Sequence, residues 1–279
     1  ALKLVKDKHK ALVIYNEGSN FSVGGNLGLA LFACNIGAFG EVEKLVATGQ
    51  KTYQDMKYAP FPVVAAPSGL ALGGGCEILL HASAVQAHAE SYIGLVECGV
   101  GVLPAWGGCT AMLERWATDP KFPKGPMPAP SKVFETVSTA TVAKSAAEAK
   151  ELKFLRDSDG ITMNRDRLLA DAKAKPLALV EGYAPPKPVE FFLPGPTGKV
   201  AMDMAVAGFA KRGMATKHDT VVSVVLAEVL TGGSADHIEP VPAAKVLELE
   251  RDGFMKLIRT TATLDRIEHI LETGRPLRN

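Results

Sequence analysis

The sequence predicts an α/β fold followed by a helical C-terminal region, and two features carry this prediction. Short runs of β-branched residues, such as Ala11–Tyr15, alternate with glycine turns and helical periodicity in the first part of the chain. Beyond the proline-rich stretches Pro185–Pro188 and Pro194–Pro196, only helical patterns recur. We therefore predict one domain over residues 1–184 and a helical region over residues 185–279.

Four strands are expected in the first hundred residues, two of them in apolar runs that suit a fully buried strand. Between the first two, a helical pattern extends from Leu27 to about Met56. Another helix opens at the glycines of Gly73–Gly75 and continues to about Ala82. The predicted strands are Ala11–Tyr15, Pro62–Ala66, Ala84–His88 and Tyr92–Ile93.

The rest of the chain reads as a loop and then helices. Five prolines between Thr118 and Ser131 predict an extended surface loop. Ser145 and Asn164 are predicted N-caps of the next two helices, and Pro176 is expected to end the second of them. The predicted helices are 146–155, 165–174, 199–212, 220–230 and 243–273.

Charge and composition exclude several classes of protein. Lysine and arginine total 31 against 30 aspartates and glutamates, so no net field attracts nucleic acid or an anionic membrane. The basic run Lys3–Lys10 is expected to be solvated surface. No apolar segment reaches the roughly 18 residues of a membrane span, and no secretory signal stands at the front. Four cysteines without a pairing pattern suit a reducing compartment, so we expect a cytoplasmic protein.

Glycines gather at two turns where the backbone itself could contact a ligand. Val23-Gly24-Gly25 follows the first strand, and Gly73-Gly74-Gly75 opens a helix. Helix N-terminal N–H groups lack intrahelical partners, and two of them converging on one oxygen would form an oxyanion hole. The alternative is that these glycines only allow close packing of helix and strand.

Two glutamates lie in apolar, glycine-rich surroundings. Glu97 interrupts the run Ile93–Gly108, and Glu77 follows the second glycine turn. Apolar surroundings raise the pKa of a carboxyl, which would fit both residues for acid–base work. For Glu77, a carboxylate satisfied by the first turn of its helix is an equally open interpretation.

Other motifs are rejected. Gly195–Lys199 lacks both the earlier glycine and the Ser or Thr of a phosphate-binding loop, and no G-x-S-x-G elbow exists. His81 and His88 are interpreted as core or surface residues, and no spacing of ligands predicts a metal site.

Taken in order, the stretches Phe21–Leu27, Ala71–Glu77 and Ile93–Gly108 resemble the crotonase (enoyl-CoA hydratase/isomerase) superfamily over about residues 11–183. The resemblance implies a superhelix of ββα units, in which the Val23 and Gly74 N–H groups form the oxyanion hole and Glu77 and Glu97 are catalytic. Further substrate contacts are expected from Gly24, Gly73, Leu103, Pro104 and Trp106, with Trp106 packing near the pocket mouth.

The presence of both glutamates favours hydration of a 2-enoyl-CoA in fatty-acid β-oxidation. An acyl-CoA is then the substrate, and no cofactor is expected. Two alternatives remain open: an enoyl-CoA isomerase, and a non-catalytic scaffold or oligomerisation module that kept the fold.

The resemblance extends to multifunctional β-oxidation proteins through the segments Ser145–Arg167 and Arg266–Asn279. It implies a 3-hydroxyacyl-CoA dehydrogenase section ahead of this chain, which itself holds no G-x-G-x-x-G fingerprint, and it implies a homo-oligomer. Two departures accompany it. The first ββα unit of the family, which contributes to its CoA pocket, is expected to be absent, and Asn26 replaces the usual acidic residue of the first motif.

Overall fold

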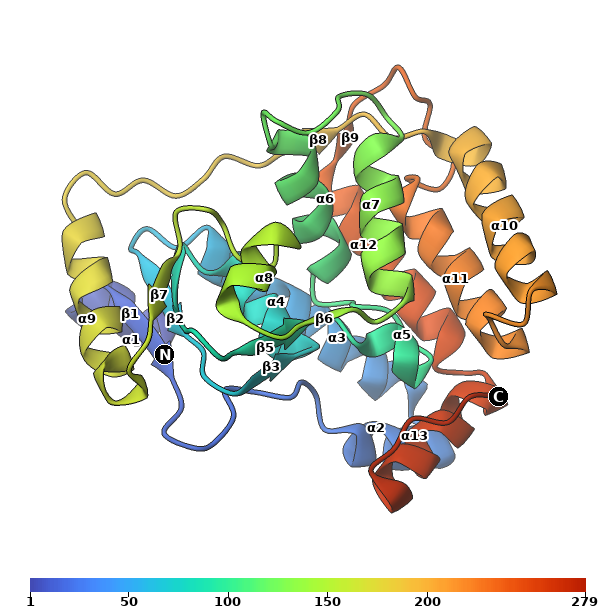
Figure 1. Ribbon diagram of the computed structural model, residues 1–279, viewed down its shortest axis with the longest axis horizontal. Coiled ribbons are helices and arrows are strands. Elements are labelled where there is room, and N and C mark those ends of the chain that lie inside the picture. The colour runs from blue at the N-terminus through green and yellow to red at the C-terminus, as the bar shows by residue number, and fades with distance from the viewer. The chain divides into compact units, whose positions relative to one another are not determined.

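The computed structural model describes all residues from 1 to 279, and the chain falls into two units (Figure 1). The mixed α/β architecture predicted from the sequence is confirmed, with several parallel strand pairs and many helices. The predicted boundary between residues 184 and 185 stays a prediction. Unit 1 comprises Ala1–Gly25, Lys51–Leu95 and Val142–Lys187, and unit 2 comprises Asn26–Gln50, Val96–Thr141 and Pro188–Asn279.

A four-stranded parallel sheet in the order β1-β2-β4-β7 forms the centre of unit 1. Every residue of β2 is buried, which explains why its sequence is continuously apolar rather than alternating. Three strands of this sheet were predicted and are confirmed within one residue, whereas the fourth, β7, was not predicted. The four strands are β1 (Leu12–Tyr15), β2 (Val63–Ala66), β4 (Ala84–His88) and β7 (Gly160–Thr162).

Helix α9 (Leu168–Leu179) packs on this sheet and corrects one prediction. Pro176 was expected to end the helix, but the helix continues past it to Leu179. Leu168, Ala172 and Pro176 recur every fourth residue on one buried stripe, and the first two pack against Ala66 of β2. Burial of this stripe offsets the roughly 3 kcal/mol that an internal proline costs a helix.

A second sheet in the order β3-β5-β6 positions the glycine-rich turns. Strand β3 leads through Gly73 directly into α4, the short helix predicted after the second glycine turn. Ser145 caps α8, as predicted, by accepting a hydrogen bond from the Glu148 N–H. The elements are β3 (Leu70–Leu72), α4 (Gly74–His81), β5 (Tyr92–Gly94), β6 (Val142–Ala143) and α8 (Ala146–Glu151).

The chain's start and the segment before α9 complete unit 1. The charged residues of the basic run at the start are exposed, as predicted, and they belong to helix α1 (Leu2–Lys8), which buries Val5 in a cluster with Met56 and Phe61. Asn164 caps a 3-10 turn, η1 (Arg165–Arg167), which precedes α9, so the predicted helix start is local 3-10 geometry.

Unit 2 is mostly helical (Figure 1). Helix α11 contacts α5, α6, α7, α10 and α12, and so lies at the centre of the unit. The only strands are a two-residue pair, β8 (Glu190–Phe191) and β9 (Val241–Pro242). The helices are α2 (Leu27–Asn35), the first part of α3 (Phe39–Lys57), α5 (Glu97–Val100), α6 (Gly108–Thr118), α7 (Pro128–Ser138), α10 (Gly195–Lys211), α11 (Lys217–Leu230), α12 (Ala243–Leu257) and α13 (Thr261–Thr273).

Two predicted long helices are each divided. The pattern from Leu27 to Met56 becomes α2 and α3, because Gly37 adopts a left-handed φ of 75° between them. The pattern 243–273 becomes α12 and α13, because the Thr260 side chain accepts from the Thr263 N–H and starts a new helix.

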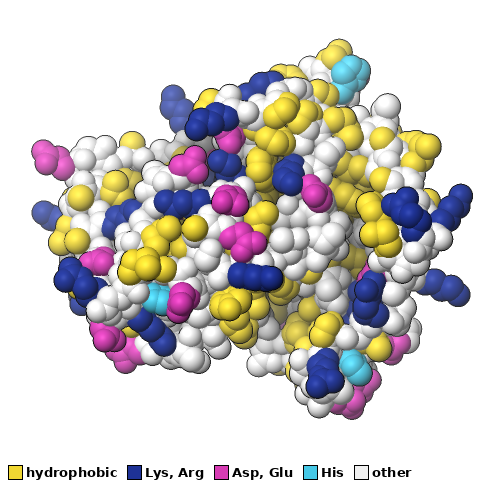
Figure 2. Space-filling model, viewed as in Figure 1, with side chains coloured by type: hydrophobic (Ala, Val, Ile, Leu, Met, Phe, Trp, Pro, Cys, Tyr) yellow, Lys and Arg dark blue, Asp and Glu magenta, His cyan; other side chains and the backbone are white.

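Three smaller features complete the picture. The predicted loop 118–131 is shorter, since α7 begins at Pro128, a residue type favoured in the first turn of a helix. Asn26 caps α2 by accepting from the Leu29 N–H. No helix is long and apolar enough to span a membrane. Figure 2 shows basic and acidic side chains interspersed over the face in view, as the balanced charge predicts.

Candidate active site

The two glycine turns of unit 1 lie against each other. Ser22 forms a parallel bridge with Ala71, which fixes the first turn beside β3. A Cβ atom at Gly24 would lie 3.2 Å from the Gly74 nitrogen, and one at Gly75 would lie 2.4 Å from the Ser22 oxygen. Only glycine at position 75 permits this approach, because real Cβ atoms do not come that close to a backbone oxygen.

The backbone N–H groups of these turns divide into two kinds. That of Gly24 donates to Ser22 Oγ at 3.3 Å, and that of Gly73 donates to the Gly94 oxygen at 2.9 Å. The N–H groups of Val23 and Gly74 donate to no other group of the chain. Gly74 is buried and is the first residue of α4, where the helix dipole favours an anion. A buried N–H without an acceptor is rare in proteins, so a ligand oxygen is a natural partner here.

Tyr53 holds the second turn in place, a role that the sequence did not suggest. Its hydroxyl donates to the Gly74 oxygen at 3.0 Å. The centroid of its ring lies 5.6 Å from that of the His81 ring. His81 Nδ1 in turn lies 2.7 Å from the backbone oxygen of Glu77. No local signal distinguishes Tyr53 from any other tyrosine in an amphipathic helix. His81 is a buried core residue, as predicted.

Glu77 lies on the fourth residue of α4 and is 1% exposed. Its backbone N–H donates to the Gly73 oxygen, so the helix that carries it starts at the second glycine turn. Val23, Gly24, Gly73, Gly74 and Glu77 therefore all belong to unit 1 and to the same junction of β3 with α4.

Glu97 belongs to unit 2, where it is the first residue of α5. The residue as a whole is half-buried, but its carboxyl oxygen Oε2 is fully buried and has no hydrogen-bond partner. Burial raises the pKa of the Glu97 carboxyl to about 7, although the backbone N–H groups of Glu97 and Val96 act to lower it. A carboxyl with this pKa is partly protonated at neutral pH and can give or take a proton there.

A second buried carboxyl in unit 2 has a different environment. Glu250 of α12 accepts from the Gly107 N–H at 2.9 Å, from the Thr110 N–H at 2.6 Å and from Thr110 Oγ1 at 2.7 Å. Burial raises its pKa to about 8, against the effect of these donors, and the charge of Glu97 raises it further. Glu250 thus caps the start of α6 across 140 residues of sequence.

Side chains near the C-terminus of the chain donate hydrogen bonds to the backbone of α5 and of the residue that follows it. Arg266 Nη1 donates to the Cys98 oxygen at 3.4 Å, and Thr263 Oγ1 donates to the Gly101 oxygen at 2.7 Å. Arg266 is 1% exposed and pairs with Asp219 at 2.8 Å. Buried side chains of α13 therefore hold the helix that carries Glu97, and Asp219 of α11 pairs with one of them, Arg266.

The remaining predicted substrate contacts lie in unit 2 and are largely packed. Leu103 has no exposed surface, and a Cβ atom at Gly253 would lie 2.7 Å from its Cδ1. Pro104 is also buried. The indole of Trp106 fills the space beside Gly49. In this structure Leu103 is a core residue of unit 2.

No group of three or more His, Cys, Asp or Glu side chains is arranged to hold a metal ion. The four cysteines are buried and form no disulfide.

Comparisons with known proteins agree with this architecture. The family model described as enoyl-CoA hydratase/isomerase matches residues 1–119. A solved enoyl-CoA hydratase from Rhodobacter sphaeroides superimposes with a TM-score of 0.66 at 18% identity, covering 100% of this chain and 82% of that one. An enoyl-CoA hydratase/isomerase from Mycobacterium paratuberculosis gives 0.59 at 18% identity, covering 96% and 83%. At this identity the likeness shows the fold.

Curated relatives are longer proteins. A probable 3-hydroxyacyl-CoA dehydrogenase of Bacillus subtilis is 38% identical over 279 residues, which is 100% of this chain and 35% of the relative. A putative fatty acid oxidation complex trifunctional enzyme of Rickettsia felis is 45% identical over 115 residues, 41% of this chain and 16% of the relative. The chain spans about a third of the first relative's length.

The fold and the glycine-lined junction define an α/β protein of the crotonase type. Residues 1–119 match the model of the enoyl-CoA hydratase/isomerase family, and the two solved structures share the fold of nearly the whole chain.

Proposed function

We propose that this chain hydrates 2-enoyl-CoA to 3-hydroxyacyl-CoA in fatty-acid β-oxidation. The observation that carries the proposal is the pair of partnerless N–H groups, Val23 and Gly74, at two turns in direct contact. Such a pair suits an oxygen that gains negative charge during the reaction, as the thioester oxygen does when an enolate forms. The match of residues 1–119 to the enoyl-CoA hydratase/isomerase family model supports this chemistry.

In the proposed mechanism the Val23 and Gly74 N–H groups bind the thioester oxygen. Glu77 takes a proton from water, whose oxygen bonds to the β-carbon, and the electron pair of the double bond passes to the thioester as an enolate. Glu97 then gives its proton to the α-carbon, and the carbonyl re-forms. The raised pKa of Glu97, about 7, supports its role as the proton donor. Because water supplies the hydroxyl group and Glu97 supplies the proton, no cofactor is required.

A variant that removes one N–H tests the oxyanion role directly. Val23→Pro lacks the N–H, whereas Val23→Ala keeps it, and Val23 is 61% exposed, so neither change opens a cavity in the core. We expect Val23→Pro to lower kcat about 100-fold or more, and Val23→Ala to change it less than threefold. The measurement is the loss of conjugated enoyl-thioester absorbance. Equal rates for both variants, or no hydration by the wild type, would contradict the proposal.

Isomerisation is the second candidate, since the matching family includes both activities. The same site could move a proton between carbons by way of the same enolate. A 3-enoyl-CoA converted faster than the 2-enoyl isomer is hydrated would favour the isomerase.

We also propose that the chain acts within a longer multifunctional protein. One relative is named a probable dehydrogenase and is nearly three times as long, and another is named a trifunctional enzyme. The 3-hydroxyacyl-CoA formed by hydration is the substrate that a 3-hydroxyacyl-CoA dehydrogenase oxidises, so the two steps would follow one another.

A further inference from the structure

The Gly74 N–H, one of the two proposed donors to the thioester oxygen, belongs to a glycine run, Gly73–Gly75, that several hydrogen bonds hold in place. Glycine loses more conformational freedom on folding than any other residue, so such a run needs anchors to keep one N–H in a single direction. The Gly73 N–H donates to the Gly94 oxygen at 2.9 Å, and the Gly73 oxygen accepts from the Glu77 N–H at 3.0 Å. Because a peptide group is planar, the second bond also fixes the plane that carries the Gly74 N–H.

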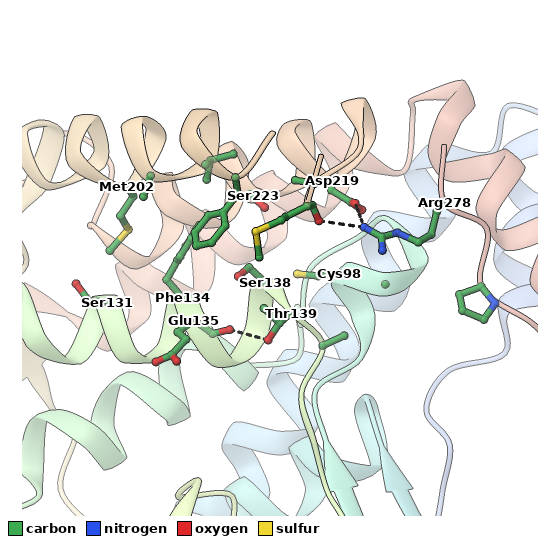
Figure 3. A pocket seen from close by; sticks show the side chains of 18 of the residues that line it. Cys98, Ser131, Phe134, Glu135, Ser138, Thr139, Met202, Asp219, Ser223 and Arg278 are labelled. Carbon is green, nitrogen blue, oxygen red and sulfur yellow. Dashed lines mark hydrogen bonds and ion pairs between the residues drawn. The ribbon is translucent and has the colours of Figure 1, made fainter. Parts of the chain in front are cut away.

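On the other side of this N–H, the Gly74 oxygen accepts from the Tyr53 hydroxyl at 3.0 Å, and this bond joins two separate helices. Several other hydroxyl groups donate to the carbonyl four residues back in the chain. Thr139 does so to the Glu135 oxygen at 2.8 Å, beside the cavity of unit 2 that Figure 3 shows. A bond of that kind is local. The Tyr53 bond instead runs from α3 to the first residue of α4, 21 residues away, so it sets the position of the glycine run relative to another element.

The Tyr53 ring is itself held in place through His81, the last residue of α4. The centroids of the two rings lie 5.6 Å apart, and their planes are tilted by 44°. His81 Nδ1 lies 2.7 Å from the Glu77 backbone oxygen, which only accepts, so this nitrogen carries a proton. On the neutral ring Nε2 is then an acceptor, and it lies 3.2 Å from the amide nitrogen of Gln54, the neighbour of Tyr53 on α3. Two adjacent residues of α3 therefore hold the first and the last residue of α4.

We propose that Tyr53 is a positioning residue of the reaction, whose hydroxyl keeps the Gly74 N–H aimed at the thioester oxygen. This inference rests on the proposed function. Tyr53 acts through Gly74 and not on the substrate itself. Negative charge on the thioester oxygen grows in the transition state, so an N–H held in the right direction stabilises that state more than it stabilises bound substrate. Loss of the hydroxyl should therefore appear in kcat rather than in KM.

Two tyrosines of unit 1 provide a matched test. Tyr53→Phe keeps the ring that packs on His81 and removes only the hydroxyl. Tyr183→Phe also removes a hydrogen-bonded hydroxyl, but its partner at 2.8 Å is Ser83 Oγ, beyond the other end of α4. Because a misplacement of about 1 Å costs up to about 100-fold in rate, we expect Tyr53→Phe to lower kcat for 2-enoyl-CoA hydration about tenfold. Its KM should stay within about twofold, and Tyr183→Phe should leave both constants within about twofold.

The stretching frequency of a bound thioester carbonyl separates this inference from hydration, because a hydrogen bond to the oxygen lowers that frequency. The probe is saturated butanoyl-CoA, isotope-labelled at its thioester carbonyl, which has no double bond to hydrate. By difference infrared spectroscopy, the wild type and Tyr183→Phe should lower the frequency equally, and Tyr53→Phe should lower it less.

If the wild type hydrates nothing but this infrared pattern holds, the hydratase proposal fails and the positioning role of Tyr53 stands. If the carbonyl frequency in Tyr53→Phe equals that in the wild type, the positioning role is refuted. A Tyr53→Phe variant that changes KM and leaves kcat as it was would refute it as well.

Discussion

The pKa of Glu97 makes a quantitative prediction about the pH dependence of hydration. As the proposed proton donor, Glu97 must be protonated when the substrate binds, and its pKa is raised to about 7. The protonated fraction falls tenfold for each pH unit above the pKa, so kcat/KM at pH 9 should be about 100-fold below its plateau. This fall of kcat/KM at high pH reports the pKa of Glu97 in the free protein, because kcat/KM reflects the ionisation of groups before substrate binds.

The assay is the initial rate of enoyl-thioester absorbance loss at low substrate concentration, from about pH 5.5 to 9, with circular dichroism to establish that the fold persists. Glu97→Gln keeps the shape and removes the proton, so it should lower kcat by about 100-fold to 10,000-fold and abolish the limb. Glu97→Asp, which keeps a carboxyl, should retain a pH-dependent limb. A wild-type profile flat from pH 6 to 9 in folded protein would refute the assignment of Glu97 as proton donor.

Three further predictions concern the groups that support the site. Gly75→Ala places a Cβ 2.4 Å from the Ser22 oxygen, so it should separate the two turns and lower both kcat and thermal stability, as hydration rates and a melting curve would show. In the wild type, the free energy of unfolding should decrease as the pH rises from about 5 to 8, and Glu250→Gln should make this decrease smaller, as urea titrations at several pH values would show. In that window the folded state, with a Glu250 pKa of about 8 against the ordinary 4.5, binds more protons than the unfolded state, so rising pH destabilises it. Arg266→Met leaves Asp219 without its buried partner and should cost roughly 3 kcal/mol and raise the Asp219 pKa from about 2, as carboxyl NMR titration would detect.

The sequence predicts best those strands, caps and helix starts that depend on only a few neighbouring residues. The strand at Val63–Ala66 follows from a continuous β-branched and apolar run, and the cap at Ser145 from its own hydroxyl and the Glu148 N–H. The helix after the second glycine turn is equally local. In contrast, no local pattern in the run Lys3–Lys10 predicts that Val5 joins a buried cluster with Met56, because no window of ten residues contains both.

Errors arise where tertiary contacts outweigh local preference. Pro176 is a helix breaker by its own chemistry, yet burial of one stripe on the sheet keeps α9 intact. The break between α12 and α13 depends on one hydroxyl, that of Thr260, which accepts from the Thr263 N–H and so starts a new helix. Periodicity therefore located the helical regions but could not count the helices within them.

The two buried carboxyls of unit 2 show what can distinguish a candidate acid from a structural one. Both have raised pKa values, about 7 for Glu97 and about 8 for Glu250, so the shift alone does not separate them. Their hydrogen bonds do: three donors from the start of α6 satisfy Glu250, whereas Oε2 of Glu97 is buried without a partner. A buried polar atom without a partner is costly and therefore rare, which points to an occupant that the isolated chain lacks. The sequence places Glu97 in an apolar run, but only the fold shows that one oxygen of its carboxyl is buried without a hydrogen-bond partner.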